Sequence, residues 1–322
     1  MNRPETIRLT ATISESLEGM RLDAAAAELF GDYSRGRIQK WIRSGDLTVD
    51  GRQYKPTHRV CTGETLVLLA EVGQEDTVLA EDIPLRVVHE DEDLLVLDKP
   101  AGLVVHPAPG NPDGTLQNAL LHFDPGLAAL PRAGIVHRLD KDTSGVMVVA
   151  RSLRAHTSLV RQLQARRMSR VYLAIACGDL AGVGTVDQPI GRHPRDRKRM
   201  AVVASGKPAI SHYRVLQRFG DASFVEVSPE TGRTHQIRVH LAQLGHPLVG
   251  DPVYGHNPRA RSALTKEQFE AVRAFPRQAL HAHRLKLVHP RDSGERTFTA
   301  PLPRDLEELL SCLRDGESDA ER

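Results

Sequence analysis

The sequence predicts an α+β fold in two domains: a small N-terminal unit, then a larger unit with a mixed, largely antiparallel sheet flanked by helices and loops. A chain of 322 residues suits two domains, since one domain usually holds roughly 100–200 residues. A polar, acidic stretch over residues 73–82 divides the chain and is predicted to be a linker. After it, several predicted strands follow one another directly without a regular βαβ rhythm, which is typical of an α+β sheet.

The N-terminal unit is predicted to span residues 17–72, behind a flexible tail over residues 1–16. Apolar residues at helical spacing begin after Arg21, and Gly31 ends that helix. The pair Asp50-Gly51 predicts a tight turn. The other elements expected here are a helix over residues 35–44 and strands over residues 47–49 and 64–69.

The second unit is predicted to span residues 83–313, followed by a disordered acidic tail over residues 314–322. Its C-terminal half includes a helix over residues 235–244, for which Thr234 is the expected N-cap. We expect Leu244 to pack inward from that helix. The other elements expected are strands over residues 85–89, 94–98, 146–151, 171–176, 212–219, 223–228 and 285–288, and helices over residues 154–164 and 303–313.

Composition and charge exclude several classes of protein. The cysteines, Cys61, Cys177 and Cys312, are few, distant and odd in number, which argues against a disulfide framework and fits a reducing compartment. The N-terminus lacks a signal-peptide core, and no apolar run reaches the ~18 residues of a membrane span. With aromatic residues at 4%, broad stacking platforms for single-stranded nucleic acid are not expected. We therefore expect a cytoplasmic protein without membrane contact.

The stretch from His137 to Gly145 is the most informative for chemistry, because it places Asp140 and Asp142 beside Arg138 and Lys141. Adjacent positive charge favours an ionised carboxylate, and an ionised Asp can act as nucleophile or base. A loop stabilised only by salt bridges stays open as the alternative. An aspartic protease requires a second such carboxylate, and a serine hydrolase a G-x-S-x-G elbow, and neither motif is present.

This stretch, with its H-R-L-D sequence, closely resembles the signature of RNA pseudouridine synthases. Two further motifs of that family follow in the expected order, Arg170–Ala174 and Thr231–His240. Together with residues 96–102 and 248–255, the resemblance covers the chain from about Leu85 to Pro303. Residues 17–69 resemble a second family, the S4 RNA-binding domain. The chain is thus expected to join an S4 domain to a pseudouridine synthase domain.

The resemblance implies roles for four residues. Asp140 is the implied catalytic aspartate, acting at the ribose C1′ or removing the C2′ proton; both remain open. Arg238 is implied to pair with Asp140, and Tyr172 to pack against the target base and remove its C5 proton. Arg138 matches the position implied to open the RNA and replace the flipped uridine. Neither a metal nor another cofactor is implied by this chemistry.

Basic residues are the candidates for contact with RNA phosphates. A solvated charged surface is the alternative reading for each cluster. One cluster of basic residues runs from Arg151 to Arg170, and no acidic residue follows Arg151 until Asp179. The residues expected to bind RNA are Arg35, Arg37, Lys40 and Arg43 in the first unit and Arg195, Arg197, Lys198 and Arg199 in the second.

The resemblance further implies the substrate. It points to structured ribosomal RNA within large-subunit particles, modified by a monomeric enzyme at uridines in the helix 69 loop of 23S RNA. Other large-subunit uridines are the nearest alternative. A catalytically silent RNA-binding assembly protein and a nucleoside hydrolase that releases uracil are alternatives of other classes.

Overall fold

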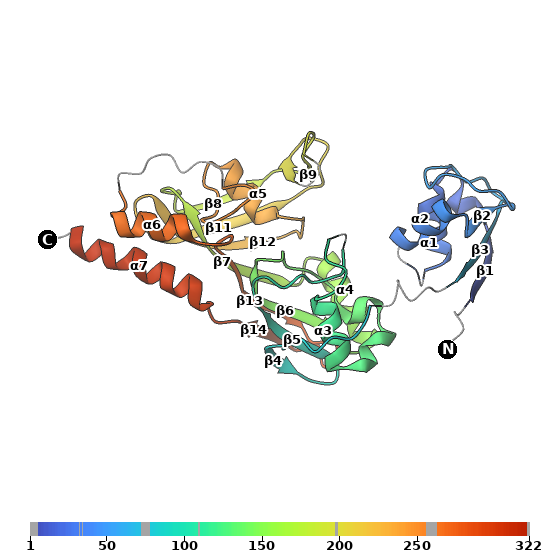
Figure 1. Ribbon diagram of the computed structural model, residues 1–322, viewed down its shortest axis with the longest axis horizontal. Helices are drawn as coiled ribbons and strands as arrows, with labels where there is room; N and C mark the ends of the chain where they lie inside the picture. The colour runs from blue at the N-terminus through green and yellow to red at the C-terminus, as the bar shows by residue number, and fades with distance from the viewer. Residues whose placement is uncertain are drawn as a thin grey trace. The chain divides into compact units, whose positions relative to one another are not determined.

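The computed structural model describes residues 6–31, 33, 35–71, 78–108, 110–196, 199–255 and 263–320. The chain divides into two compact units, residues 1–78 and 79–322 (Figure 1). Residues 73–77, the first half of the predicted linker, and the candidate RNA ligands Arg197 and Lys198 lie outside the described residues. Among those described, no helix is both long and apolar enough to cross a lipid bilayer.

The first unit packs two helices on a small antiparallel sheet. Its core includes Leu22, Ile38, Trp41 and Leu66, all at most 3% exposed. The order of its strands is β1-β3-β2. The elements are β1 (Thr6–Thr12), α1 (Leu22–Leu29), α2 (Arg35–Ser44), β2 (Leu47–Val49) and β3 (Thr65–Glu71).

The expectation of a flexible tail over residues 1–16 is wrong from Thr6 onward. Strand β1 pairs along its whole length with β3. Its apolar residues Ile7, Leu9 and Ala11 alternate with polar ones and pack against the core of the unit. This period of two is the signal of a half-buried strand. Because every second residue is polar, the segment as a whole looks polar, and this is why a tail was expected.

The second unit is built on one mixed sheet in the order β4-β5-β6-β13-β7-β12-β11-β8, with β14 paired to β13. All pairs are antiparallel except β6 with β13. The strands are β4 (Val87–Glu90), β5 (Leu94–Lys99), β6 (Ser144–Ala150), β7 (Ser169–Cys177), β8 (Val183–Asp187), β11 (Ile210–Arg218), β12 (Ala222–Pro229), β13 (Leu280–Val288) and β14 (Glu295–Thr299).

Helices cover both faces of this sheet (Figure 1). On one face, α3 (Leu116–Phe123) and α4 (Leu153–Gln164) share a core with Tyr172 of β7. On the other face, α6 (Lys266–Ala274) and α7 (Arg304–Ala320) share a core with Leu173, the next residue of β7. Strand β7 is therefore buried on both sides, and its alternation directs Tyr172 to the α4 face. The remaining elements are the hairpin β9 (Ile190–Arg192) with β10 (Met200–Val202), and α5 (Gln236–Gln243).

The prediction of a disordered tail over residues 314–322 is wrong for the backbone as far as Ala320, because α7 continues to that residue. Leu306, Leu309, Leu310 and Leu313 anchor the first part of the helix in the core. Nothing in the following residues requires the helix to end, since they contain no proline. The single Gly316 costs only about 1 kcal/mol relative to alanine.

Candidate active site

The loop that carries the H-R-L-D motif begins with an unusual backbone turn. Arg132 and Ala133 both adopt left-handed conformations, with φ of 53° and 51°. Such a conformation costs roughly 1–2 kcal/mol per non-glycine residue. At Gly134 a side chain is impossible, because a Cβ there would lie 1.9 Å from the carbonyl oxygen of Ala150. The turn thus brings the chain into direct contact with β6.

The next residues are fixed along β6. Ile135 forms a β-bridge with Val149, and the backbone N–H of Val148 donates to Nε2 of His137 at 3.1 Å. Burial lowers the pKa of His137 to about 3, and the positive charge of Arg170 adds to the effect. The ring is therefore neutral, as an acceptor at Nε2 must be. The role of His137 in the motif is therefore structural: it fixes the loop to β6.

Buried cations hold the backbone of the loop from Asp140 to Thr143. Nζ of Lys99, a residue only 1% exposed, donates to the carbonyl oxygen of Lys141 at 2.9 Å. On the other side, Nη1 of Arg277 donates to the carbonyl oxygen of Asp142 at 3.0 Å. The backbone N–H of Gly102 also donates to the carbonyl oxygen of Lys141, at 3.0 Å, so the loop is held from several sides. These bonds also fix the direction in which the side chain of Asp140 projects.

Asp140 meets Arg238 of α5, which in turn is held by Asp251. Nη1 of Arg238 donates to Oδ2 of Asp140 at 3.1 Å, while its Nε and Nη2 form a bidentate pair with Asp251 at 2.7 and 2.9 Å. The side chains of Arg238 and Asp251 are 5% and 0% exposed, and that of Asp140 is 19% exposed. Burial alone lowers the pKa of Arg238, but the two carboxylates outweigh burial and raise it. A permanently charged, aligned guanidinium therefore faces Asp140.

The N-terminus of α5 differs from the prediction. Its N-cap is His235, in a left-handed conformation with φ of 56°, so Thr234 is not the cap. Nε2 of His235 lies 3.9 Å from Oδ2 of Asp140, and its Nδ1 is 2.9 Å from the hydroxyl of Tyr254. At the other end, Leu244 is 40% exposed and does not pack inward. The strained backbone at His235 thus turns its imidazole toward Asp140 rather than toward helix capping.

Tyr172 projects from β7 on the face of the sheet that α3 and α4 cover. It lines the same cleft as Asp140. It is 8% exposed. Burial raises the pKa of its hydroxyl, the charge of Arg170 opposes this, and Asp140 adds to it. In the protein without substrate, Tyr172 is therefore a neutral phenol with its ring packed beside Asp140.

The cleft around Asp140 has a volume of about 560 Å³ and a basic rim. Arg138 and Arg132 are exposed and line it together with His106. Burial lowers the pKa of His106 to about 4, and the charge of Arg132 contributes. Among the described residues, no group of three or more His, Cys, Asp or Glu side chains is placed to hold a metal ion. The cleft combines two carboxylates, Asp140 and Glu230, with one phenol and several cations, and this excess of positive charge suits a polyanionic substrate.

The remaining candidate RNA ligands lie in two places. In α2, Lys40 and Arg43 are exposed, whereas the guanidinium of Arg37 packs 4.8 Å from the ring centre of Trp41. The side chain of Arg35 lies outside the described residues, as do Arg197 and Lys198. Arg195 is exposed in the loop between β9 and β10, and Arg199 packs over the ring of Tyr254 at 5.3 Å. Arg199 is therefore linked to the site through Tyr254, whose hydroxyl lies 2.9 Å from Nδ1 of His235.

Sequence reasoning missed Asp251, Tyr254 and His235 as parts of the site. Asp251 and Tyr254 lie in the stretch 248–255, which matches the family but shows no helical or strand period. Asp251 follows Gly250, whose φ of 69° is open to glycine and where a Cβ would lie 2.1 Å from the carbonyl oxygen of Arg277. A glycine-aspartate pair within an otherwise apolar stretch was the available signal for a buried carboxylate.

Comparison with known proteins identifies the family. Residues 93–243 match the RNA pseudouridylate synthase family, and residues 20–66 match the S4 domain. Ribosomal large subunit pseudouridine synthase D of Pseudomonas aeruginosa is 54% identical over 310 residues, which cover 96% of this chain and 97% of that protein. The chain belongs to the RNA pseudouridylate synthase family. It is accordingly an isomerase that forms pseudouridine in RNA.

Other family members agree with this assignment. The protein of the same name from Escherichia coli K12 is 50% identical over 311 residues, or 96% of this chain and 95% of that protein. Among solved structures, Human RNA Pseudouridylate Synthase Domain Containing 4 superposes with a TM-score of 0.56 at 28% identity, over 71% of this chain and 93% of that one. The second unit therefore has the family fold as well as its motifs.

The bidentate pair between Asp251 and Arg238, called the clamp from here on, leads to a first prediction. Asp251→Asn replaces the bidentate carboxylate by a neutral amide, so we expect a loss of about 3–5 kcal/mol in the free energy of unfolding, as for other broken buried ion pairs. Pseudouridine formation should fall as well, because Arg238 loses its alignment with Asp140. Urea denaturation and a single-turnover assay measure the two effects.

The matched control for this prediction is Asp305→Asn. It breaks another bidentate pair, with Arg277, but the carboxylate of Asp305 is 37% exposed, and its loss should cost less. Equal losses in the two variants, or an Asp251→Asn protein as stable as the wild type, contradict the clamp.

Proposed function

We propose that this enzyme isomerises uridines in large-subunit 23S ribosomal RNA, in the helix 69 loop, at Asp140 and without a cofactor. The large-subunit assignment is supported by relatives at 54% and 50% identity over nearly the whole chain, whose names specify that RNA. Helix 69 is our inference from the closeness of this chain to those D-type proteins. We take the substrate to be RNA within ribosomal particles and the enzyme to act as a monomer in the cytoplasm.

The observation that carries the chemical proposal is the free oxygen of Asp140. Among the described residues, only its Oδ2 is hydrogen-bonded, to Arg238, so Oδ1 has no protein partner. Oδ1 is therefore available either to attack the ribose C1′ or to remove the C2′ proton. Both routes break the C1′–N1 bond, after which the base turns and joins C1′ through C5. The C5 proton is then lost and N1 gains one.

The remaining site residues act on the base and the RNA in this proposal. A paired base is reached only after it is flipped out, at a cost of a few kcal/mol. Arg138 lines the cleft, and its proposed role is to occupy the space that the uridine leaves. Tyr172 supports the flipped base with its ring and removes the C5 proton. Lys40 and Arg43 of α2, together with Arg195 and Arg199, hold the phosphates.

The proposed function is tested by mapping pseudouridines in ribosomal RNA from a strain that lacks this protein. We expect the helix 69 pseudouridines to disappear and to return when the purified enzyme is added to the ribosomal particles. Loss at other large-subunit positions would replace the helix 69 assignment. Release of free uracil by the purified enzyme would indicate a nucleoside hydrolase, and an unchanged map would leave only an assembly role.

A second prediction concerns the helix α2. Replacing Lys40 and Arg43 together by glutamine should weaken binding to 23S RNA and flatten the dependence of log affinity on log salt by about 1.4–1.8, from roughly 0.7–0.9 per lost phosphate contact. The maximal single-turnover rate should change little, because Asp140 lies in the other unit. Filter binding at several salt concentrations measures the slope.

The control for this prediction makes the same charge change at Arg8 and Arg52, which are exposed on the same unit. We expect its slope to equal that of the wild type. If both double variants flatten the slope equally, net charge and not the α2 surface determines RNA binding by this unit.

A further inference from the structure

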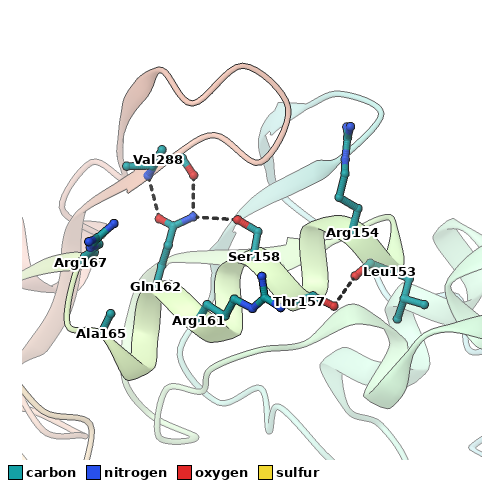
Figure 2. A pocket seen from close by; sticks show the side chains of 9 residues that line it. All are labelled: Leu153, Arg154, Thr157, Ser158, Arg161, Gln162, Ala165, Arg167 and Val288. Carbon is teal, nitrogen blue, oxygen red and sulfur yellow. Dashed lines mark hydrogen bonds between the residues drawn. The ribbon is translucent and has the colours of Figure 1, made fainter.

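We propose that the outer face of α4 is a second phosphate-binding surface, the α4 groove, for the same RNA whose uridine enters the cleft; the identity of that RNA rests on the proposed function. The groove lies outside the catalytic cleft, has a volume of about 620 Å³, and is shown in Figure 2. It is lined by Leu153, Arg154, Thr157, Ser158, Arg161, Gln162, Ala165, Arg167 and Val288.

The charge of the groove is positive and only partly neutralised. Arg154 forms an ion pair with Asp93 at 2.7 Å. Arg161 and Arg167 are exposed, and among the described residues neither guanidinium has a hydrogen-bond or ion-pair partner. No acidic residue occurs between Arg151 and Asp179 to provide one nearby in sequence. Two uncompensated arginines beside a third are the arrangement that attracts phosphates.

The floor of the groove is rigid. The side-chain amide of Gln162 donates to the carbonyl oxygen of Val288 at 2.7 Å and accepts from its N–H at 2.8 Å (Figure 2). This pair joins α4 to the end of β13, and Gln162 also donates to the hydroxyl of Ser158 at 3.3 Å. Arg161 therefore projects from a fixed helix. Arg167 projects from the turn after the helix, where its backbone N–H donates to the carbonyl oxygen of Gln162 at 2.8 Å, so binding by this surface loses less conformational entropy.

Continuity with the catalytic cleft indicates RNA as the occupant. The last turn of α4 and the residues directly after it are shared between the two cavities: Leu163, Gln164 and Arg166 line the cleft, whereas Ala165 and Arg167 line the groove. An RNA strand with its uridine at Asp140 therefore reaches the groove by crossing this helix end. Phosphate contacts at such a site position the substrate and carry no sequence information.

The test replaces Arg161 and Arg167 together by glutamine and measures binding to transcribed 23S RNA across a range of salt concentrations. The matched control replaces Arg273 of α6 and Arg304 of α7 by glutamine. These helices pack on the opposite face of the sheet from α4. Pseudouridine formation by the wild type on the same RNA, and single-turnover rates of the variants at saturating RNA, are measured in parallel.

We expect the Arg161/Arg167 variant to bind more weakly, with a salt slope flattened by about 1.4–1.8, while the control matches the wild type and the rate at saturation is unchanged. Wild-type affinity and slope in the Arg161/Arg167 variant overturn the α4 groove, as does a defect that appears only on ribosomal particles, which indicates a protein partner. Absence of pseudouridine formation by the wild type on both this RNA and ribosomal particles contradicts the proposed function instead, and a groove-dependent slope in that case still supports RNA binding.

Discussion

Asp140→Asn is expected to abolish pseudouridine formation, with a loss of at least about four orders of magnitude in the single-turnover rate, the scale seen when one member of a catalytic triad is removed. The substitution is nearly isosteric but removes the negative charge that attacks or deprotonates the ribose. RNA affinity and fold should remain close to those of the wild type. Arg238 keeps its bidentate pair with Asp251, so no buried cation is left without a carboxylate.

The control for this variant is Asp142→Asn, in the same loop. The carbonyl oxygen of Asp142, and not its carboxylate, accepts the bond from Arg277, so the loop should hold its shape. We expect Asp142→Asn to keep most of the activity. If Asp142→Asn is inactive and Asp140→Asn is active, the assignment of the chemistry to Asp140 is wrong. If both variants are fully active, the proposed mechanism is excluded.

Tyr172→Phe is expected to have the second largest effect. It keeps the ring that packs beside Asp140 but removes the hydroxyl, so RNA binding should be near normal while turnover is largely lost. If the hydroxyl removes the C5 proton, a rearranged adduct that still carries that proton should accumulate. The adduct is isomeric with uridine and pseudouridine, so the substrate carries tritium at C5 of uridine. Retention of the tritium in a new species, in place of its release to solvent, detects the adduct after chromatography of the quenched, digested RNA.

The pH dependence of the reaction tests the same role independently. Burial raises the pKa of Tyr172, so the phenolate that acts as base is a minor species at neutral pH. Its fraction rises about tenfold for each pH unit below that pKa. Where the C5 step limits turnover, the wild-type rate should therefore increase from pH 7 to pH 9, and the Tyr172→Phe rate should not. Parallel profiles, or full activity in the variant, leave Tyr172 with packing alone.

Much of the fold could be predicted from local patterns. The helix of residues 153–164 and the apolar spacing of Leu306 to Leu313 carry a helical period that matches the structure. The strand of residues 144–150 is instead recognised as a short, continuous apolar run, and it is buried at every position. The short strands β9, β10 and β14 were missed. Their formation depends on a neighbouring strand rather than on their own residues, which local propensity does not encode. The helices α3 and α6 were missed as well, although each begins with a capping box, Thr115 with Asn118 and Thr265 with Gln268.

The candidate site divides in the same way. Asp140 was predicted from its motif, and the structure places Arg238, 98 residues later, within 3.1 Å of it. Without the family resemblance, Arg238 reads as a surface cation, because its burial is decided by the position of α5 against Asp251. The bidentate clamp and the turn of His235 toward Asp140 are likewise tertiary. Spacing along the chain contains no measure of either.

The parallel pairing of β6 with β13 has a consequence for how the enzyme matures. Ser144 and Gly145, directly after the catalytic loop, pair with His281 and Ala282, and Arg277 holds the loop itself. Closing so long a stretch of chain is entropically costly and slow, so these contacts form late in folding. During synthesis the first unit is complete some 200 residues before β13 leaves the ribosome. A nascent chain can therefore already carry its RNA-binding unit while Asp140, the proposed catalytic residue, is still unplaced, and we expect activity to begin only when the last third of the protein has been made.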